Sequence, residues 1–461
     1  MKTILFVLPS KMNIRDLVLI PGGVFDMLSK KKDIRLVVVI PRGQYKKFQS
    51  ELMEREERGE AIFEVVDTTS PKRWYQKAFM FFVKYLVWTD TMQLLAREGV
   101  RADVPPAGGR QYLFWVKRLV YQIFGRIPFI KTVVVPRLFL VLFLESPYKN
   151  LFEKYHPDLL FISDVKPFWG LYLLAEAKRR GIRSVQMPGN WDHFKYYFPL
   201  QSDVLLTNNE PLAEEAYGYE NYKRESVSVV GFPRFDFFLR SRETETREAF
   251  LKRYGFPENA NVILFVSEGP YVLDDGDIVD MLLEKIEDGT FPDNTYILLR
   301  PYPPYPGQHG EGEKYGVFEG NPRVAFDTTN SWKAVDNLSN FVSLIAHADV
   351  VVETYSTVAI ESLVFEKPVV NIGFDGRHTR KKEQSVTRFV HLSHFQHITK
   401  TGGVPTVTSE QELIDTVSAY LTDPSHNKEA RARARERMCG PLDGASARRL
   451  AERIVTEAYA K

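Results

Sequence analysis

The feature that most constrains this chain is the alternation of short apolar runs with longer amphipathic stretches. The first series of runs occupies residues 4–8, 36–40, 62–66, 159–162, 184–187, 204–207 and 227–230. Runs this short and this uniformly apolar are typical of parallel strands buried on both faces, and the stretches between them are typical of covering helices. The first half of the chain is therefore predicted to be a doubly wound α/β domain.

A second series of apolar runs begins after a charged segment at 240–252, with members at 262–266, 296–299, 324–326, 350–353 and 369–372. This series predicts a second Rossmann-like domain, as expected because 461 residues exceed what one hydrophobic core usually supports. We place the boundary at residue 245, giving domains 1–245 and 246–461. The second domain should end in a helix over 446–460, capped by Ser446.

Composition excludes several classes of protein. A formal net charge of +2 gives no general attraction to nucleic acid. The single cysteine, Cys439, cannot form an intrachain disulfide, which fits a reducing cytoplasm. The longest apolar candidate, 138–144, is far shorter than the roughly 20 residues of a membrane-spanning helix. We expect a cytoplasmic protein whose N-terminus is a first β-strand.

The strongest local signal is the block 348–363 with its continuation 366–371, which predicts a strand, a hydroxyl-rich turn, a helix, a turn and a strand. At the carboxyl end of a parallel strand, the next helix presents unpaired N–H groups and the positive end of its dipole. Ser356 and Thr357 are therefore candidates for holding a diphosphate, and Glu361 for accepting hydrogen bonds from a ribose or sugar. Alternatively, the two hydroxyls only cap a helix and Glu361 lies on its surface.

This block resembles the "strand, Asp-Tyr-Ser-Ser, helix, Gly-Lys-Pro-Val" segment of the CDP-glycerol glycerophosphotransferases and related GT-B enzymes. The same region is comparable to the donor-binding part of the non-hydrolysing UDP-GlcNAc 2-epimerases. Further motifs, at 202–208, 229–236 and 298–303, match in the expected order, so the resemblance spans roughly residues 155–375.

The resemblance implies an α/β fold of GT-B architecture, with two Rossmann-like domains and an interdomain cleft. It also implies a glycosyltransferase that takes a nucleotide-activated sugar donor on its C-terminal domain and a glycan or lipid-linked acceptor on its N-terminal domain, to build a surface polysaccharide. The alternatives are a CDP-alditol phosphotransferase of the teichoic-acid type, a UDP-sugar 2-epimerase and a non-catalytic assembly subunit. The donor is a substrate on this interpretation, and neither a metal nor a further cofactor is expected.

Carried over to single residues, the resemblance assigns the donor's phosphates to Arg300 and to the Ser356 turn. Family members often have His-Pro where this chain has Tyr302-Pro303, so Arg300 would supply the positive charge with its fixed donors. The alternative for Arg300 is a buried structural arginine. Glu268 directly follows the first strand of the second domain, which makes it another donor-site candidate.

The segment 188–195 follows a strand of the first domain and brings a carboxylate, an imidazole and a cation together. Its Asn190-Trp191-Asp192 tripeptide is similar to one in a group of predicted surface-polysaccharide glycosyltransferases. Asp192 or His193 could remove the proton of the acceptor hydroxyl, while Asn190 and Trp191 are candidates for acceptor binding. Alternatively, Trp191 only fills a wall and Asp192 caps a turn.

A pair of glycines and a short acidic run give weaker signals. Gly22 and Gly23 could let an acceptor approach the backbone closely, but a simple turn explains them equally well. The acidic run at 274–277 is predicted to cap a helix rather than bind a metal, and no full Walker loop or G-x-G-x-x-G fingerprint occurs.

Residues about 70–150 form a predicted basic and aromatic helical insertion in the first domain. No acidic residue occurs from 104 to 144, and aromatic residues recur there at helical spacing. The basic residues of segment 110–144 are Arg110, Lys117, Arg118, Arg126, Lys131 and Arg137. Such a segment could seat the protein peripherally on an anionic membrane. Equally, its helices could cover the first sheet with their basic residues solvated.

Overall fold

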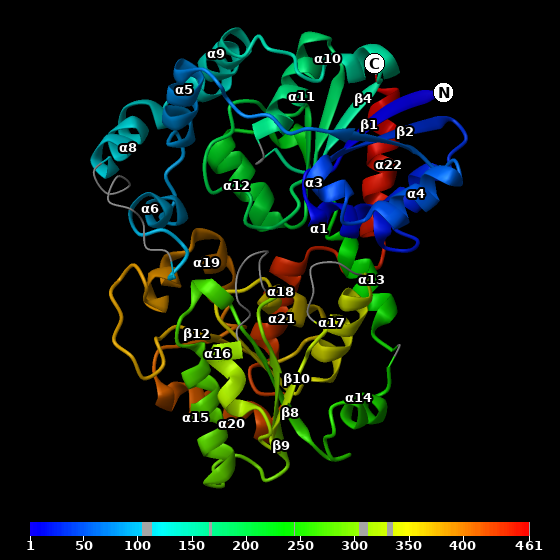
Figure 1. Ribbon diagram of the computed structural model, residues 1–461. Helices are drawn as coiled ribbons and strands as arrows, with labels where there is room; N and C mark the ends of the chain where they lie inside the picture. Colours follow the sequence, from blue (N-terminus) through cyan, green and yellow to red (C-terminus); the bar gives the residue numbers. More distant parts are fainter. Residues whose placement is uncertain (104–112, 166–167, 244, 304–311, 330–334, 461) are drawn as a thin grey trace. The chain divides into compact units, whose positions relative to one another are not determined.

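The computed structural model describes residues 1–103, 113–165, 168–243, 245–303, 312–329 and 335–460 (Figure 1). The chain divides into two compact units. Unit 1 consists of Met1–Met92, Trp115–Phe237 and Gly440–Lys461, and unit 2 of Gln93–Phe114 and Phe238–Cys439.

Unit 1 is built on a parallel sheet of seven strands in the order β3-β2-β1-β4-β5-β6-β7. Strand β1 pairs with β2 along its whole length, from Lys2 with Ile34 to Val7 with Val39. The side chains of β1, β2, β4, β5 and β6 are almost completely buried because helices cover both faces of the sheet. All seven predicted strands are present. They are β1 (Lys2–Val7), β2 (Ile34–Pro41), β3 (Ile62–Val66), β4 (Leu159–Ile162), β5 (Arg183–Gln186), β6 (Val204–Thr207) and β7 (Val227–Val229).

The connections of unit 1 are helical, as the amphipathic stretches predicted. They comprise α1 (Lys11–Ile14), η1 (Arg15–Leu19), α2 (Val24–Ser29), α3 (Arg42–Tyr45), α4 (Gln49–Glu57), α5 (Trp74–Lys84), α8 (Phe114–Val120), η2 (Tyr121–Gly125), η3 (Ile130–Val134), α9 (Val135–Leu142), α10 (Lys149–Tyr155), α11 (Phe168–Arg179), α12 (Glu210–Glu220), η4 (Arg224–Ser226) and α22 (Ser446–Tyr459). Helices α6 (Asp90–Arg97) and α13 (Pro233–Ser241) lie where the chain passes between the units.

Unit 2 contains a second parallel sheet, in the order β10-β9-β8-β11-β12-β13. Its strands are β8 (Asn261–Val266), β9 (Thr295–Arg300), β10 (Val324–Phe326), β11 (Val350–Glu353), β12 (Val369–Ile372) and β13 (Thr406–Val407). Only the two-residue β13 was not predicted, because it is too short to give a periodic signal. Its helices are α14 (Arg247–Arg253), η5 (Gly269–Tyr271), α15 (Asp275–Glu287), α16 (Gly312–Tyr315), η6 (Gly316–Phe318), α17 (Val335–His347), α18 (Val358–Val364), η7 (Val386–His391), α19 (Ser393–Thr399), α20 (Glu410–Thr422) and α21 (Lys428–Cys439).

The domain composition differs from the predicted one in its last helix. Helix α22 belongs to unit 1, where it contacts α2, β1, β4 and β5, rather than closing the C-terminal domain. The carboxylate of Asp236 accepts hydrogen bonds from the backbone N–H groups of Ser446 (3.1 Å) and Ala447 (2.8 Å), and so caps the helix. The predicted cap, Ser446, is instead the first helical residue.

Two further differences concern the boundary and the insertion. The chain passes into unit 2 after Phe237 rather than at residue 245. Part of the predicted N-terminal insertion, Gln93–Phe114, also belongs to unit 2.

Within the described ranges, no helix combines the length and apolar character needed to cross a membrane.

Candidate functional site

The order of the sheet in unit 2 reverses between β8 and β11. Strands β9 and β10 extend the sheet from β8 in one direction, and β12 and β13 extend it from β11 in the other. In open α/β sheets, ligands bind outside the carboxyl ends of the strands at this switch point. Glu268 follows β8, and Ser356 and Thr357 follow β11, so three of the predicted donor-site residues lie at adjacent strand ends.

The turn after β11 is held by neighbouring polar groups. Tyr355 has a left-handed backbone (φ 49°), and its N–H donates to Oδ1 of Asn371 at 2.6 Å. The N–H of Ser356 donates to the carboxyl of Glu353, and the Ser356 hydroxyl accepts a long hydrogen bond (3.4 Å) from the N–H of Val358. Thr357 occupies the N-cap position of α18 without a capping hydrogen bond from its side chain.

Glu353 is the last residue of β11, and its side chain is fully buried. Burial raises the pKa of its carboxyl well above the ordinary range, and the charge of Glu268 nearby adds to the shift. Among the described residues, its Oε1 atom has no hydrogen-bond partner. The raised pKa favours the neutral form of the Glu353 carboxyl, and a neutral carboxyl repels a nearby phosphate less than a carboxylate would. The sequence interpretation missed Glu353, although a glutamate ending an apolar strand is a visible signal.

Arg300 lies at the carboxyl end of β9 and is only 6 % exposed. Its guanidinium forms an ion pair with the buried Asp327, donates to Oδ1 of Asn337 at 3.1 Å, and lies 4.7 Å from the centre of the Phe341 ring. Burial lowers the pKa of Arg300, while Asp327 favours its charged form, as does the more distant Glu361. These contacts fit the structural alternative for Arg300, and its phosphate-binding role stays a prediction.

The loop after β8 is built closely onto its surroundings. Gly269 has φ 58°, and a Cβ added there would lie 2.6 Å from the Tyr302 ring, so the position requires glycine. The Tyr302 ring therefore packs against this loop. The Ser267 hydroxyl donates to the buried Asp275 at 3.0 Å, and Asp275 also pairs with Lys314 at 2.5 Å.

The acidic run that includes Asp275 thus makes internal contacts, but none of them is a side-chain capping hydrogen bond from the N-cap residue of α15, so the capping interpretation holds for the position of Asp274 alone. Asp274 occupies the N-cap position of α15 and accepts two hydrogen bonds from Arg380. In the described portions of the chain, no group of three histidine, cysteine, aspartate or glutamate side chains could hold a metal ion.

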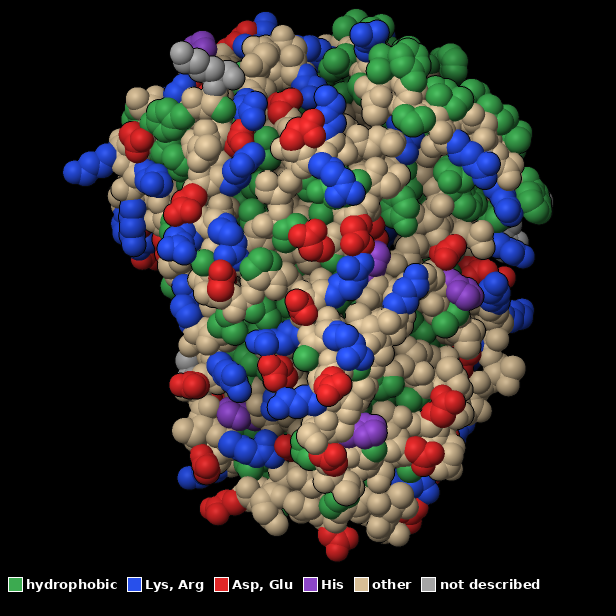
Figure 2. All heavy atoms as spheres, turned by 180° about the vertical axis from the view of Figure 1, so that it is seen from behind, with side chains coloured by type: hydrophobic (Ala, Val, Ile, Leu, Met, Phe, Trp, Pro, Cys, Tyr) green, Lys and Arg blue, Asp and Glu red, His purple; other side chains and the backbone are tan. Residues whose placement is uncertain are grey.

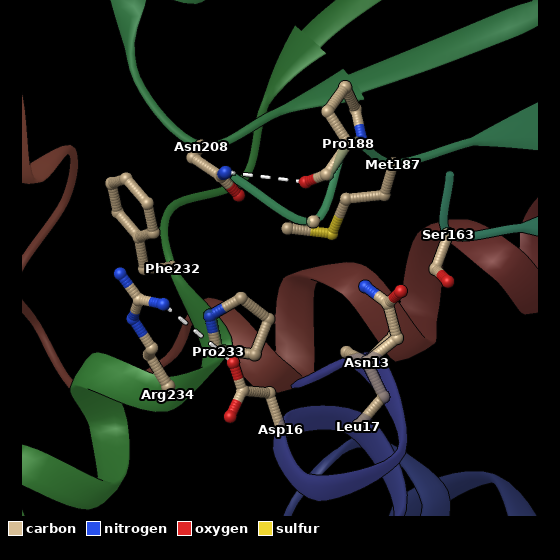
Figure 3. Close-up of a pocket in the computed structure, with 11 residues that line it drawn as sticks. Asn13, Asp16, Leu17, Ser163, Met187, Pro188, Asn208, Phe232, Pro233 and Arg234 are labelled. Atoms are coloured by element: carbon tan, nitrogen blue, oxygen red, sulfur yellow. Dashed lines mark hydrogen bonds and ion pairs between the residues drawn. The ribbon is translucent and has the colours of Figure 1, made fainter. Parts of the chain in front are cut away.

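Unit 1 has its own switch point, between β1 and β4. A small pocket of about 30 Å³ lies at this carboxyl edge (Figure 3). Arg234 approaches Asp16 (3.8 Å) on its rim, and Asn208 donates to the carbonyl of Pro188 at 3.4 Å. The lining residues are Asn13, Asp16, Leu17, Ser163, Met187, Pro188, Gly189, Asn208, Phe232, Pro233 and Arg234.

Most of the polar lining of this pocket was not singled out from the sequence. Asn13 and Asp16 follow β1, Ser163 follows β4, and Arg234 follows β7. A systematic inspection of the residues after each predicted strand would have found them, because all carboxyl ends of a parallel sheet meet at one edge.

The segment 188–195 reaches the pocket through its first residues. A Cβ added to Gly189 would lie 2.4 Å from Nδ2 of Asn13, so glycine lets these two segments meet. Oδ1 of Asn190 accepts from the N–H of Trp191 at 3.0 Å, and the Trp191 side chain is buried, so the acceptor-binding roles of both residues stay predictions. Asp192 forms an ion pair with Lys195 and keeps part of its side chain exposed.

His193, the second predicted base, is enclosed completely. Its ring stacks on Phe198 with centroids 4.8 Å apart, Nε2 lies 3.1 Å from the amide nitrogen of Gln186, and Nδ1 lies 3.6 Å from the Asp164 carboxylate. Asp164 is itself partly exposed and adjoins Ser163 of the pocket. In this geometry, the His193 ring is not accessible for direct contact with an acceptor, and its role as a base stays a prediction.

Gly22 and Gly23 form an exposed turn before α2. The N–H of Gly22, which has φ 65°, donates to Oδ2 of Asp26 at 2.7 Å. A Cβ on Gly23 would lie 2.8 Å from the carbonyl oxygen of Ile20. These contacts account for both glycines as turn residues, and neither lines the pocket of unit 1.

Comparison with known proteins adds a family and a fold. The family model described as "CDP-Glycerol:Poly(glycerophosphate) glycerophosphotransferase" matches residues 194–456. Comparison with curated protein sequences gives no match.

Solved structures resemble the chain over nearly its full length. One is a UDP-GlcNAc 2-epimerase from Neisseria meningitidis bound to UDP-GlcNAc (TM-score 0.56, 12 % identity, 98 % of this chain and 100 % of that one). Another is a putative UDP-N-acetylglucosamine 2-epimerase from Listeria monocytogenes (0.54, 12 %, 99 % and 96 %). A third is a glycosyltransferase from Rickettsia africae ESF-5 (0.50, 12 %, 100 % and 99 %). At these identities the likeness concerns the fold, and it confirms the predicted two-domain α/β fold of the GT-B type.

Proposed function

Because the chain belongs to the CDP-glycerol:poly(glycerophosphate) glycerophosphotransferase family, we propose that it transfers a glycosyl or alditol-phosphate group from a nucleotide-activated donor to a growing surface polymer. The observation that carries this proposal is the family match over 194–456, which includes the whole sheet of unit 2 and its switch point. The resemblance seen in the sequence motifs is thereby confirmed, and the chain is a transferase.

The donor site proposed in unit 2 is the edge between β8 and β11. The Ser356 hydroxyl and the start of α18 would hold the diphosphate, and Glu268 would accept hydrogen bonds from ribose or sugar hydroxyls. The neutral Glu353 carboxyl supports this assignment because it limits the negative charge beside the phosphates. Arg300 would act mainly by holding Asp327 and the end of β9, which fixes the edge on its other side.

The acceptor site proposed in unit 1 is the pocket at the β1 and β4 ends. Its amide, carboxylate, hydroxyl and guanidinium groups would receive a single hydroxyl group of the acceptor, because the pocket has room for little more. Asp192 is the better placed of the two predicted bases, since its side chain is partly exposed whereas His193 is enclosed. The family match begins at Phe194, so neither base lies within the matched range. We propose no metal and no cofactor beyond the donor substrate.

The activity can be tested with the purified full-length protein and paired donors. CDP-glycerol and UDP-GlcNAc should be supplied with and without a lipid-linked acceptor, and the products separated by mass. Transfer to the acceptor from either donor supports the proposal and identifies the transferred group. Conversion of UDP-GlcNAc to its 2-epimer without an acceptor would instead establish the isomerase alternative.

An anionic membrane surface is the proposed partner of unit 1. An exposed apolar patch on its helices supports this assignment, with side chains between 42 % and 80 % exposed. Figure 2 shows apolar side chains gathered at the upper right, where α5, α8 and α9 lie. The patch consists of Trp74, Phe82, Trp115, Val116, Leu119, Ile123, Phe124, Ile127, Phe129, Leu138, Val141 and Leu144.

The cations beside this patch are fewer than the sequence suggested. Lys117 is buried with its ammonium 5.4 Å from the centre of the Tyr85 ring, and Lys131 is buried and donates to the carbonyl of Tyr219 at 2.5 Å. Burial also lowers the pKa of Lys131. Arg110 lies outside the described residues. Within the described part of segment 110–144, the cations that keep solvent exposure are Arg118, Arg126 and Arg137.

A further inference from the structure

Residues 98–103, here called the strap, come from the first quarter of the chain but belong to unit 2. The strap lies against the loop that follows β8. The N–H groups of Ala102 and Asp103 both donate to the carbonyl of Pro270, at 2.9 and 3.4 Å. Ala102 is fully buried in this contact.

Arg388 joins the strap and the loop from within. Its Nη2 donates to the carbonyls of Val100 and Tyr271, both at 2.7 Å, and its Nη1 donates to the carbonyl of Ser385. The guanidinium is 3 % exposed and lies 4.0 Å from the centre of the Phe389 ring. One side chain thus satisfies carbonyls from three separate segments, which a shorter or single-headed cation could not do.

Two further side-chain contacts hold the strap in place. The carboxylate of Glu98 pairs with Lys382 at 3.1 Å, and the amide of Gln384 donates to the carbonyl of Ala102 at 3.4 Å. The opposite side of the loop is fixed by Lys314, which donates to the carbonyl of Val272 at 2.8 Å. The loop is therefore clamped between the strap and Lys314.

The clamped loop begins at Glu268, at the switch point next to Ser356. Resting on the donor site proposed above, we infer that Arg388 and the strap are positioning elements of that site: they fix the loop so that Glu268 faces the donor. A segment from the N-terminal half of the sequence thereby completes the scaffold of the C-terminal donor site. Arg388 acts through the loop and does not itself touch the donor.

The test uses the full-length protein and two variants that perturb the contact from opposite sides. Arg388→Lys keeps the charge but loses the bridge between two carbonyls, and Ala102→Pro removes the N–H that reaches Pro270. Arg377→Lys, at an exposed arginine paired with Asp280 and Glu284, is the matched control. Titration calorimetry with CDP and UDP measures nucleotide affinity, and hydrogen exchange of residues 268–272 reports on the loop.

We expect each variant to bind at least about tenfold more weakly to whichever of CDP and UDP the wild type binds more tightly. Its melting temperature should stay close to that of the wild type, and the backbone amides of residues 268–272 should exchange their hydrogens faster. The control should match the wild type. Wild-type affinity in a folded Arg388→Lys protein overturns the inference and leaves the proposed function intact. If the wild type binds neither nucleotide, both fail. If a variant has a clearly lower melting temperature, the hydrogen-exchange rate of residues 268–272 is compared with that of β8. An equal increase in exchange in the loop and in β8 also overturns the positioning role.

Discussion

Replacing Glu353 by glutamine should stabilise unit 2 at neutral pH. The wild-type carboxyl is fully buried with a raised pKa, so the folded state keeps it protonated whereas the unfolded state ionises it freely above about pH 4.5. Stability contributed by a group of this kind is complete below its unfolded pKa and is lost as the pH rises toward its folded pKa. Glutamine is always neutral and still offers an acceptor to the N–H of Ser356.

The magnitude follows from linkage. Between pH 4.5 and the raised pKa, the wild type loses about 1.4 kcal/mol of unfolding free energy for each pH unit, and the Glu353→Gln variant does not. The advantage of the variant therefore grows with each pH unit above 4.5 until the raised pKa of Glu353 is reached. Below pH 4.5 the two proteins should be nearly equally stable.

Native-state hydrogen exchange of residues 350–364 at several pH values between 4.5 and 7.5 measures this difference within unit 2 itself. Glu366→Gln is the matched control, because that carboxylate is largely exposed and pairs with Arg435 on the surface. The control should follow the wild type throughout. A difference between Glu353→Gln and the wild type that stays constant over this pH range would refute the conclusion that Glu353 is neutral in the folded protein.

Further substitutions test the other assignments. Ser356→Ala should weaken nucleotide binding about 10- to 150-fold, since a hydrogen bond to a charged group contributes about 1.5–3 kcal/mol, and unchanged affinity by calorimetry would contradict this. Arg300→Ala should cost about 3–5 kcal/mol of stability by leaving Asp327 buried without its cation; full stability with lost nucleotide affinity would restore its role as a phosphate ligand. Asp192→Asn should lower turnover by roughly 10²–10⁴-fold at unchanged donor affinity, and near-normal turnover would exclude it as the base. Replacing Arg118, Arg126 and Arg137 by glutamine should reduce sedimentation of the protein with anionic vesicles, and added salt should reduce sedimentation of the wild type. Failure of the wild type to sediment with these vesicles at low salt would contradict the membrane assignment.

The sheets were predictable because a strand that is buried on both faces gives a short run of consecutive apolar residues in the sequence. The same is true of the turn at Ser356, which directly follows such a strand. Features that depend on distant residues were not predictable. Asp236 caps α22 from 210 positions away in the sequence, and only the folded chain shows that this helix joins unit 1 rather than unit 2.

The side-chain environment was the other quantity that the sequence could not supply. Lys117 and Lys131 look like members of a basic surface, yet both point inward. His193 sits in a segment rich in chemical groups but is enclosed by aromatic rings. Glu353 appears as an ordinary strand end, and its significance comes from complete burial beside Glu268. In each case the sequence specifies the group, and packing decides its charge and access.

The central claim is that a nucleotide-activated donor binds unit 2 at the edge between β8 and β11. Hydrogen exchange of the wild type with and without CDP-glycerol or UDP-GlcNAc tests it most directly. The account predicts slower exchange at 267–271 and 354–358 when the correct donor is present, with little change around 10–16 in unit 1. Protection that appears at the unit 1 pocket and not at these two loops would contradict it.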